Sequence, residues 1–240
     1  MSSTQTNALG QPVGFPIPNW EACAAPSRAP MDGRTVRLEA LSAAKHGDDL
    51  AAAFAADKDG GMWTYMVVGP FNDDRAGFDA WLASCETSTD PLFYTVISTE
   101  TGKAMGYTSY LRIEPKVGVI EVGNITLSPA LQRTVMATET MYLMMKRVFD
   151  ELGYRRYEWK CDSLNAPSRS AAARLGFTYE GIFRQATLYK GRNRDTAWFS
   201  ILDSEWPALK TRFEGWLSAT NFDADGRQRV ALRDAGQAPT

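Results

Sequence analysis

The chain has 240 residues, of which 44% are hydrophobic, and a formal net charge of −2; this length suits one domain with extended ends and a full core. The absence of a basic excess argues against electrostatic binding of nucleic acid. Since no run of about eighteen apolar residues occurs and residues 1–10 lack the order of a secretory signal, we expect a cytoplasmic protein with no membrane span.

The first predicted elements surround an aromatic loop. Five prolines among small polar residues predict that residues 1–31 form an extended arm instead of a domain. Residues 34–41 alternate polar and apolar side chains as a strand does, and helices are predicted over 42–58 and 73–86. The loop between these helices, 60–71, holds aromatic residues between glycines. It is either a lid or substrate wall, or a plug that fills the core.

The rest of the predicted domain is a hairpin followed by a strand–helix–strand unit. β-rich runs at 92–98 and 104–113 flank a short turn, and a third strand follows at 117–128. Apolar residues then recur at helical spacing until Gly153 ends the helix; they are Met141, Met144, Met145, Val148, Phe149 and Leu152. The later elements are strands at 155–161, 177–185 and 196–202, and helices at 166–175 and 204–218. This order predicts one α+β domain over 32–218, with helices on the faces of a mixed sheet, and a polar tail over 219–240.

Cysteine and histidine usage disfavours several kinds of chemistry. Cys23, Cys85 and Cys161 lie far apart with no paired metal spacing, which indicates free thiols and no metal site. A nucleophilic Cys161 is the alternative to a small buried hydrophobe. The only histidine, His46, lies in a polar helix start. Because Ser-His-Asp, Cys-His and His-zinc sites all need a placed histidine, most hydrolase classes are disfavoured.

Three segments carry a family resemblance. Residues 121–132 (EVGNITLSPALQ) are followed by 132–139 (QRTVMATE), and then by Asn165-Ala-Pro-Ser168 with Arg174-Leu-Gly-Phe177. They resemble, in order, the fourth strand, the Q/R-x-x-G-x-G/A pyrophosphate loop and the N-x-x-S…K/R-x-G-F motif of the GNAT superfamily of acyl-CoA-dependent N-acetyltransferases, and of its RimJ/RimL-like branch in particular. The resemblance covers about 33–213. It implies a mixed, mostly antiparallel sheet that splays between its fourth and fifth strands and is flanked by helices.

The resemblance also implies acetyl-CoA as cofactor and a primary amine, on a protein N-terminus or a small molecule, as acceptor, with direct attack in a ternary complex. A helix start offers unpaired amides and a dipole that hold a pyrophosphate; the residues assigned to it are Gln132, Arg133, Thr134, Val135, Met136, Ala137 and Thr138. Family members usually carry glycine where Val135 and Ala137 stand, but valine is sterically allowed in a first helical turn. The alternative is an ordinary helix start capped by Thr134.

The other half of the cofactor site is the splayed strand. In the family this strand is bulged, and pantetheine pairs with its freed edge, here the backbone of Ile125 and Leu127. One of these N–H groups can stabilise the oxyanion. Asn165 matches an asparagine that contacts the cofactor, a role compatible with capping the helix that follows.

Two residues are candidates for proton transfer. Glu121 matches a fourth-strand glutamate that is the base in some family members, and strand alternation places it among apolar residues, so burial should raise its pKa. Its alternative role is that of a structural carboxylate. The tyrosine that many members use as acid is replaced here by Ala172. Ser168 matches the serine of the RimL-like branch, and capping or a cofactor hydrogen bond is its alternative role.

The acceptor side is the least specified. Trp63, Tyr65, Phe71, Asn124 and Tyr189 are predicted to line it, each with a core or surface role as the alternative. The polar turn 191–195 either recognises the acceptor or is simply a charged hairpin tip. Two other classes remain open: a non-catalytic acyl-CoA-binding regulatory module on the same fold, and an interaction protein that uses the arm and the tryptophan-rich last helix. A homodimer is compatible with all three.

Overall fold

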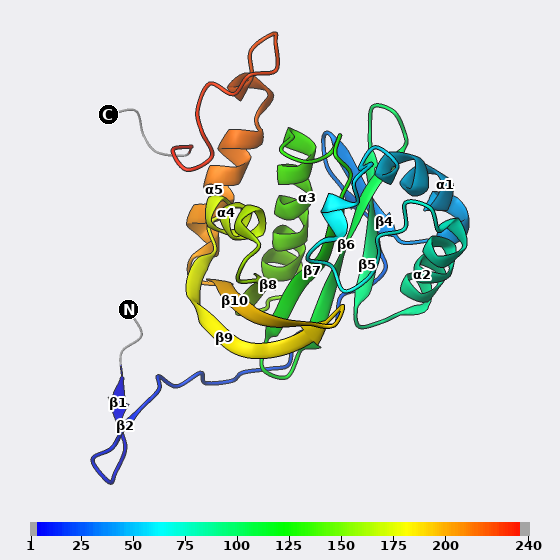
Figure 1. The fold of residues 1–240 in the computed structure, drawn as a ribbon. Helices are drawn as coiled ribbons and strands as arrows, with labels where there is room; N and C mark the ends of the chain where they lie inside the picture. The colour runs from blue at the N-terminus through cyan, green and yellow to red at the C-terminus, as the bar shows by residue number, and fades with distance from the viewer. Residues whose placement is uncertain (1–3, 236–240) are drawn as a thin grey trace.

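The fold is built on one mixed sheet, seen in a computed structural model that describes residues 4–235 (Figure 1). The strand order is β3-β4-β5-β6-β7-β8-β10-β9. All neighbours are antiparallel except β7 and β8, which are parallel. The predicted α+β fold is therefore confirmed. The strands are β3 (Met31–Asp32), β4 (Val36–Ala40), β5 (Leu92–Ser98), β6 (Ala104–Glu114), β7 (Val119–Leu127), β8 (Arg156–Asp162), β9 (Thr178–Tyr189) and β10 (Arg192–Leu202).

Helices cover both faces of the sheet and create two cores. On one face, α1 (Ala43–Phe54) and α2 (Arg75–Thr87) pack on β5 and β6 and enclose an aromatic core. On the other, α3 (Val135–Lys146) and α5 (Trp206–Leu217) enclose the larger core, while α4 (Ala166–Arg174) lies beside them (Figure 1). Short helical turns are η1 (Gly61–Trp63), η2 (Arg147–Glu151), which continues α3 as a π-helix, and η3 (Ala219–Asn221).

The methionine stripe of α3 forms the centre of the larger core. Met144, Met145 and Val148 are fully buried, as the helical spacing predicted. Glu139, on the same helix, accepts hydrogen bonds from the amides of Arg34 and Thr35, both at 2.7 Å. This buried carboxylate joins α3 to the turn that links β3 and β4.

Both chain ends leave the domain and return to it. In the arm, β1 (Gln5–Thr6) and β2 (Pro12–Val13) pair outside the body (Figure 1). Farther along, the Trp20 indole donates to the carbonyl of Lys116 at 2.8 Å, and its ring covers Gly118, where a Cβ would lie 2.6 Å from it. The polar tail contributes Leu232 and Ala235 to the larger core.

The described residues contain neither a membrane-spanning helix nor a metal cluster. Within residues 4–235, no helix is both long enough and apolar enough to cross a bilayer. The same part of the chain contains no group of three or more His, Cys, Asp or Glu side chains that could hold a metal ion. Its three cysteines are free.

Candidate active site

The parallel strands β7 and β8 separate partway along their length. They pair only from Val119–Arg156 to Val122–Trp159, so residues 123–127 and 160–162 have no partner across this gap. A bulge in β7 accompanies the separation, and Asn124 within it has a φ of 49°. The amide of Ser128 donates to the carbonyl of Met105 on the β6 side. Because backbone groups alternate along a strand, those of Ile125 and Leu127 point into the gap.

The turn from β7 to α3 presents free amides beside this gap. Thr134 is the N-cap of α3, and its hydroxyl accepts from the amide of Ala137 at 3.2 Å. Among the described residues, the amides of residues 133–136 have no backbone hydrogen-bond partner. The Gln132 side chain donates to the carbonyl of Leu127 at 2.9 Å and fixes the turn against the strand. Four neighbouring N–H groups without a backbone partner thus lie at the positive end of the helix dipole.

Valine is tolerated in this turn because the left-handed residue is elsewhere. Arg133 has a φ of 61°, whereas Val135 is the first residue of α3, where φ is negative. Thr138 is less available than predicted: its hydroxyl donates to the carbonyl of Thr134 and accepts from Arg174 at 3.1 Å. Arg174 is the cation of the R-x-G-F segment, and sequence reasoning used it only as a motif position. The structure places its guanidinium beside the first turn of α3.

Glu121 lies on the face of the sheet opposite α3 and is only 4% exposed. Its Oε2 atom is 2.8 Å from both Arg112 Nη1 and Lys160 Nζ. Burial raises the pKa of Glu121, the predicted direction, while Lys160 and Arg112 act against that rise. Sequence reasoning missed both cations, because the spacing along the chain does not give the register between strands.

Ser168 and Asn165 lie at the start of α4, close to the end of β8. The Asn165 side chain caps the helix by accepting from the Ser168 amide at 3.1 Å. The Ser168 hydroxyl accepts from the Trp159 indole at 3.0 Å. An oxygen that accepts a hydrogen bond keeps its own proton to donate. Burial raises the pKa of the neighbouring Cys161 thiol, which disfavours the thiolate that a nucleophile requires.

The five residues predicted on the acceptor side lie in three places. Trp63 and Phe71 lie in the aromatic core, with ring centroids 5.2 Å apart. Tyr65 and Tyr189 instead hold the end of β8: their hydroxyls donate to the carbonyl of Leu164 at 3.2 Å and to Asp162 Oδ2 at 2.8 Å. Asn124 faces β6, where its amide donates to the Ser109 hydroxyl at 2.9 Å.

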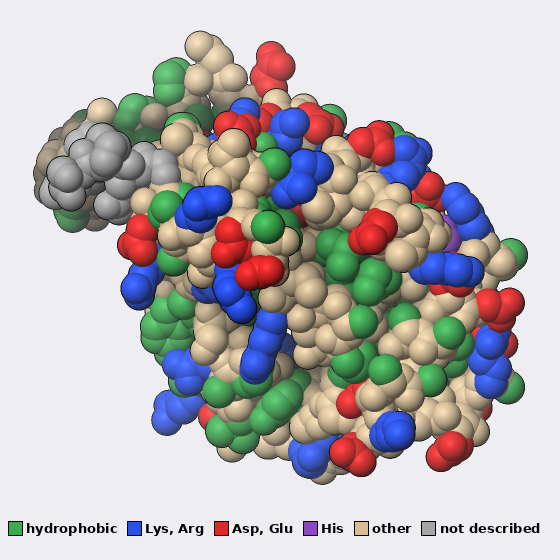
Figure 2. Space-filling view, turned by 90° about the horizontal axis from the view of Figure 1, so that it is seen from above, with side chains coloured by type: hydrophobic (Ala, Val, Ile, Leu, Met, Phe, Trp, Pro, Cys, Tyr) green, Lys and Arg blue, Asp and Glu red, His purple; other side chains and the backbone are tan. Residues whose placement is uncertain are grey.

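The aromatic loop also meets the last hairpin. Lys190 donates to the carbonyl of Trp63 at 2.7 Å, and Arg192 donates to that of Thr64 at 3.4 Å. The loop, the hairpin tip and the end of β8 are therefore connected by side-chain hydrogen bonds, three of which end on main-chain carbonyls. Seen from the end where α3 begins, hydrophobic side chains gather near the middle of the face and charged side chains of both signs surround them (Figure 2).

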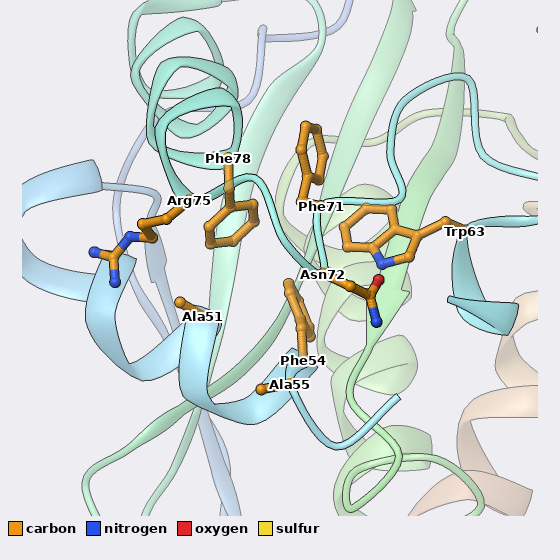
Figure 3. Close-up of a pocket in the computed structure, with 8 residues that line it drawn as sticks. All are labelled: Ala51, Phe54, Ala55, Trp63, Phe71, Asn72, Arg75 and Phe78. Carbon is orange, nitrogen blue, oxygen red and sulfur yellow. The ribbon is translucent and has the colours of Figure 1, made fainter. Parts of the chain in front are cut away.

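A small cavity of about 100 Å³ lies away from the gap, between α1, η1 and α2. Figure 3 shows the rings of Phe54, Trp63, Phe71 and Phe78 turned toward one another around it. The remaining lining residues are Ala51, Ala55, Asn72 and Arg75. This cavity belongs to the aromatic core; it contains Trp63 and Phe71, predicted for the acceptor side, but none of the residues predicted to bind the cofactor or transfer protons.

Comparison with known proteins identifies the family. Residues 36–178 match the model of the acetyltransferase (GNAT) domain. A GCN5-related N-acetyltransferase of Brucella melitensis is 49% identical, with a TM-score of 0.88 over 90% of this chain and 98% of its own. A probable GNAT-family acetyltransferase of Chromobacterium violaceum is 41% identical, with a TM-score of 0.76 over 82% of this chain and 98% of its own. Two more distant proteins share the fold, each at 18% identity and a TM-score of 0.62. One is RimL, the ribosomal L7/L12 alpha-N-protein acetyltransferase. The other is the microcin C7 self-immunity acetyltransferase MccE, which was solved with acetyl-CoA and AMP. The chain belongs to the GNAT family of N-acetyltransferases.

Proposed function

We propose that the chain transfers the acetyl group of acetyl-CoA directly to a primary amine, on a protein N-terminus or a small molecule, within a ternary complex. The observation that carries this proposal is the pairing of two features at one place. A strand edge is freed by the separation of β7 from β8, and the free amides of residues 133–136 lie beside it. The fold-related MccE was solved with acetyl-CoA, which supports a cofactor site of this kind.

Each half of the cofactor has a chemically suitable partner. The pyrophosphate accepts hydrogen bonds from the amides of residues 133–136, while Arg133 and Arg174 supply positive charge. The pantetheine amides pair with the backbone of Ile125 and Leu127 in the gap, as an added strand would. The thioester then lies between β7 and the start of α4, where Ser168 is located.

Glu121 is the proposed base. It removes a proton from the ammonium of the acceptor, directly or through a water, and the free amine attacks the thioester carbonyl. A backbone N–H of β7 stabilises the oxyanion. As the tetrahedral intermediate collapses, the C–S bond breaks and the thiolate of coenzyme A leaves, taking a proton from the Ser168 hydroxyl. Ser168 regains a proton from the attacking nitrogen, which becomes the nitrogen of the amide. The products are the acetylated amine and coenzyme A.

The test is the release of free thiol from acetyl-CoA with a panel of amines, N-terminal peptides and aminoacyl nucleotides. We expect at least one acceptor to give turnover and an acetylated product of the corresponding mass. In Glu121→Gln, kcat should fall by about 100-fold or more, the usual contribution of a placed base. The dissociation constant of acetyl-CoA should stay unchanged, because Glu121 does not contact the cofactor in this arrangement.

A non-catalytic acyl-CoA-binding module is the second candidate. The observation in its favour is that Ala172, buried at the position of the usual tyrosine, cannot supply a proton. This candidate predicts tight binding of acetyl-CoA with no thiol release for any acceptor in the panel. Thiol release that depends on Glu121 would exclude it.

A further inference from the structure

Six charged side chains cross the sheet in strictly alternating sign. They start on β6 and end on β9, in the order Arg112, Glu121, Lys160, Glu158, Arg156 and Glu180. Each charged group lies within 2.8 Å of the next. The five ion pairs are Arg112–Glu121, Glu121–Lys160, Lys160–Glu158, Glu158–Arg156 and Arg156–Glu180. We call this row the ion-pair ladder. It runs on the face opposite α3, and the candidate base is its second member.

Lys160 is the most deeply buried cation of the ladder. Its side chain is 4% exposed, and Nζ lies 2.8 Å from Glu121 Oε2 and 2.7 Å from Glu158 Oε2. The Trp198 ring covers the ammonium, with its centroid 3.6 Å from Nζ. An ammonium has three N–H donors, so two carboxylates and an aromatic face occupy all three directions. Lys160 is therefore held in one position between the two strands.

The two oxygens of Glu121 have different surroundings. Oε2 accepts a hydrogen bond from Arg112 and forms an ion pair with Lys160 at 2.8 Å, whereas Oε1 has no hydrogen-bond partner among the described residues. Some polar side-chain atoms of the described residues are fully buried without a partner. Oε1 does not belong to these atoms, so part of its surface is accessible to water. A Cβ built on Gly123 would lie 3.7 Å from Oε1. This oxygen therefore faces the first β7 residue beyond the paired segment, where the gap opens.

We propose that Lys160 is a positioning residue for acetyl transfer, which holds Glu121 by Oε2 so that Oε1 is presented, ionised, to the amine or its bridging water. The inference rests on the proposed role of Glu121 as the base. The charged groups that face Glu121 are Arg112 from β6 and Lys160 from β8, with Glu158 behind Lys160. Burial favours the neutral acid, and the cations oppose it, so Lys160 helps to keep the base ionised at neutral pH.

The ladder allows two matched substitutions with opposite electrostatic effects. Lys160→Met removes one cation from Glu121, while Arg112 still pairs with Glu121 and Arg156 still pairs with Glu158. Glu158→Gln removes the competing carboxylate, so that Lys160 acts on Glu121 alone, while Arg156 keeps Glu180. Each variant breaks buried ion pairs but leaves every remaining charge a partner, so both should fold.

The experiment is the pH profile of kcat/KM with one acceptor, on wild type and both variants, with thermal unfolding as the folding control. Using one acceptor keeps the ionisation of the amine constant across the series. A base acts only when deprotonated, so the acidic limb should move to higher pH in Lys160→Met and to lower pH in Glu158→Gln. At neutral pH, kcat of Lys160→Met should fall by roughly 10-fold to 100-fold with KM for acetyl-CoA unchanged.

Two outcomes would overturn the inference, and they differ from each other. If Glu121→Gln loses activity but the acidic limb stays in place in both ladder variants, Lys160 is structural and only this inference fails. If Glu121→Gln keeps the wild-type kcat, the proposed base is wrong, and the inference fails with it. Opposite shifts in the two variants would support it, because a loss of stability shared by both cannot produce them.

Discussion

The amide of Val135 can be removed without disturbing the helix that it begins. Val135 is the first residue of α3, a position where proline is favoured because the amide has no partner within the helix. The preceding residue must be extended, and Thr134 has a φ of −97° and a ψ of 170°. Val135→Pro therefore deletes one of the N–H groups that we assign to the pyrophosphate. The fold should be retained.

The size of the effect follows from the charge of the acceptor. A hydrogen bond to a charged group contributes about 1.5–3 kcal/mol, and about 1.4 kcal/mol changes a dissociation constant tenfold. The dissociation constant of acetyl-CoA should thus rise by about 10-fold to 100-fold. Val135→Ala is the matched control, because it loses the packing of the valine side chain against the larger core but keeps the amide.

Isothermal titration calorimetry of both variants measures the difference in affinity, and urea unfolding is the control for their stability. Acetyl-pantetheine, which lacks the pyrophosphate, should bind both variants with the same affinity. Equal affinity of the two variants for acetyl-CoA would refute the assignment of this amide. Weaker binding of both ligands by Val135→Pro would show that the substitution distorts the gap instead.

Three further predictions concern other groups. The His46 Nδ1 atom accepts a hydrogen bond from the Ser42 amide, and burial lowers the pKa of His46. The unfolded chain therefore binds a proton at this histidine more readily than the folded chain. The free energy of unfolding should fall as the pH drops below about 6.5. Urea unfolding across pH should lose this slope in His46→Gln. Glu139→Gln places an NH₂ group against backbone donors and should lower the free energy of unfolding by about 1–3 kcal/mol, measured by chemical denaturation. Ser168→Ala should lower kcat and change KM for acetyl-CoA less. A wild-type kcat in this variant would remove Ser168 from the mechanism.

Elements with one buried face could be predicted from the sequence, and exposed ones only in part. The strand at 92–98 matches β5, and the helix at 166–175 matches α4 within one residue, because apolar and capping residues mark them. The strands at 177–185 and 196–202 are too short, since β9 and β10 extend to 189 and back to 192. Nearly all of β9 is exposed, so no alternation of burial marks its length.

The parts of the candidate site that depend on local sequence could be predicted. The helix start at Thr134 and the cap at Asn165 are local features, and motif spacing was sufficient to place them. Lys160 and Arg112 reach Glu121 from two neighbouring strands, and only the register of the sheet brings them together. A pattern within one strand contains no information about that register.

Backbone strain marks the same region independently of the motifs. Within residues 4–235, six residues other than glycine have a positive φ, and five of them lie on β6, on β7, in the turn before α3 or in the β9–β10 hairpin: Arg112, Asn124, Arg133, Gln185 and Lys190. Each such conformation costs roughly 1–2 kcal/mol for a residue with a side chain, and strain of this kind concentrates at functional sites. Arg112 and Asn124 flank the base, and Arg133 opens the amide turn. Glycine would relieve the strain at Arg133, whereas the arginine joins a left-handed backbone to a positive charge beside the proposed pyrophosphate.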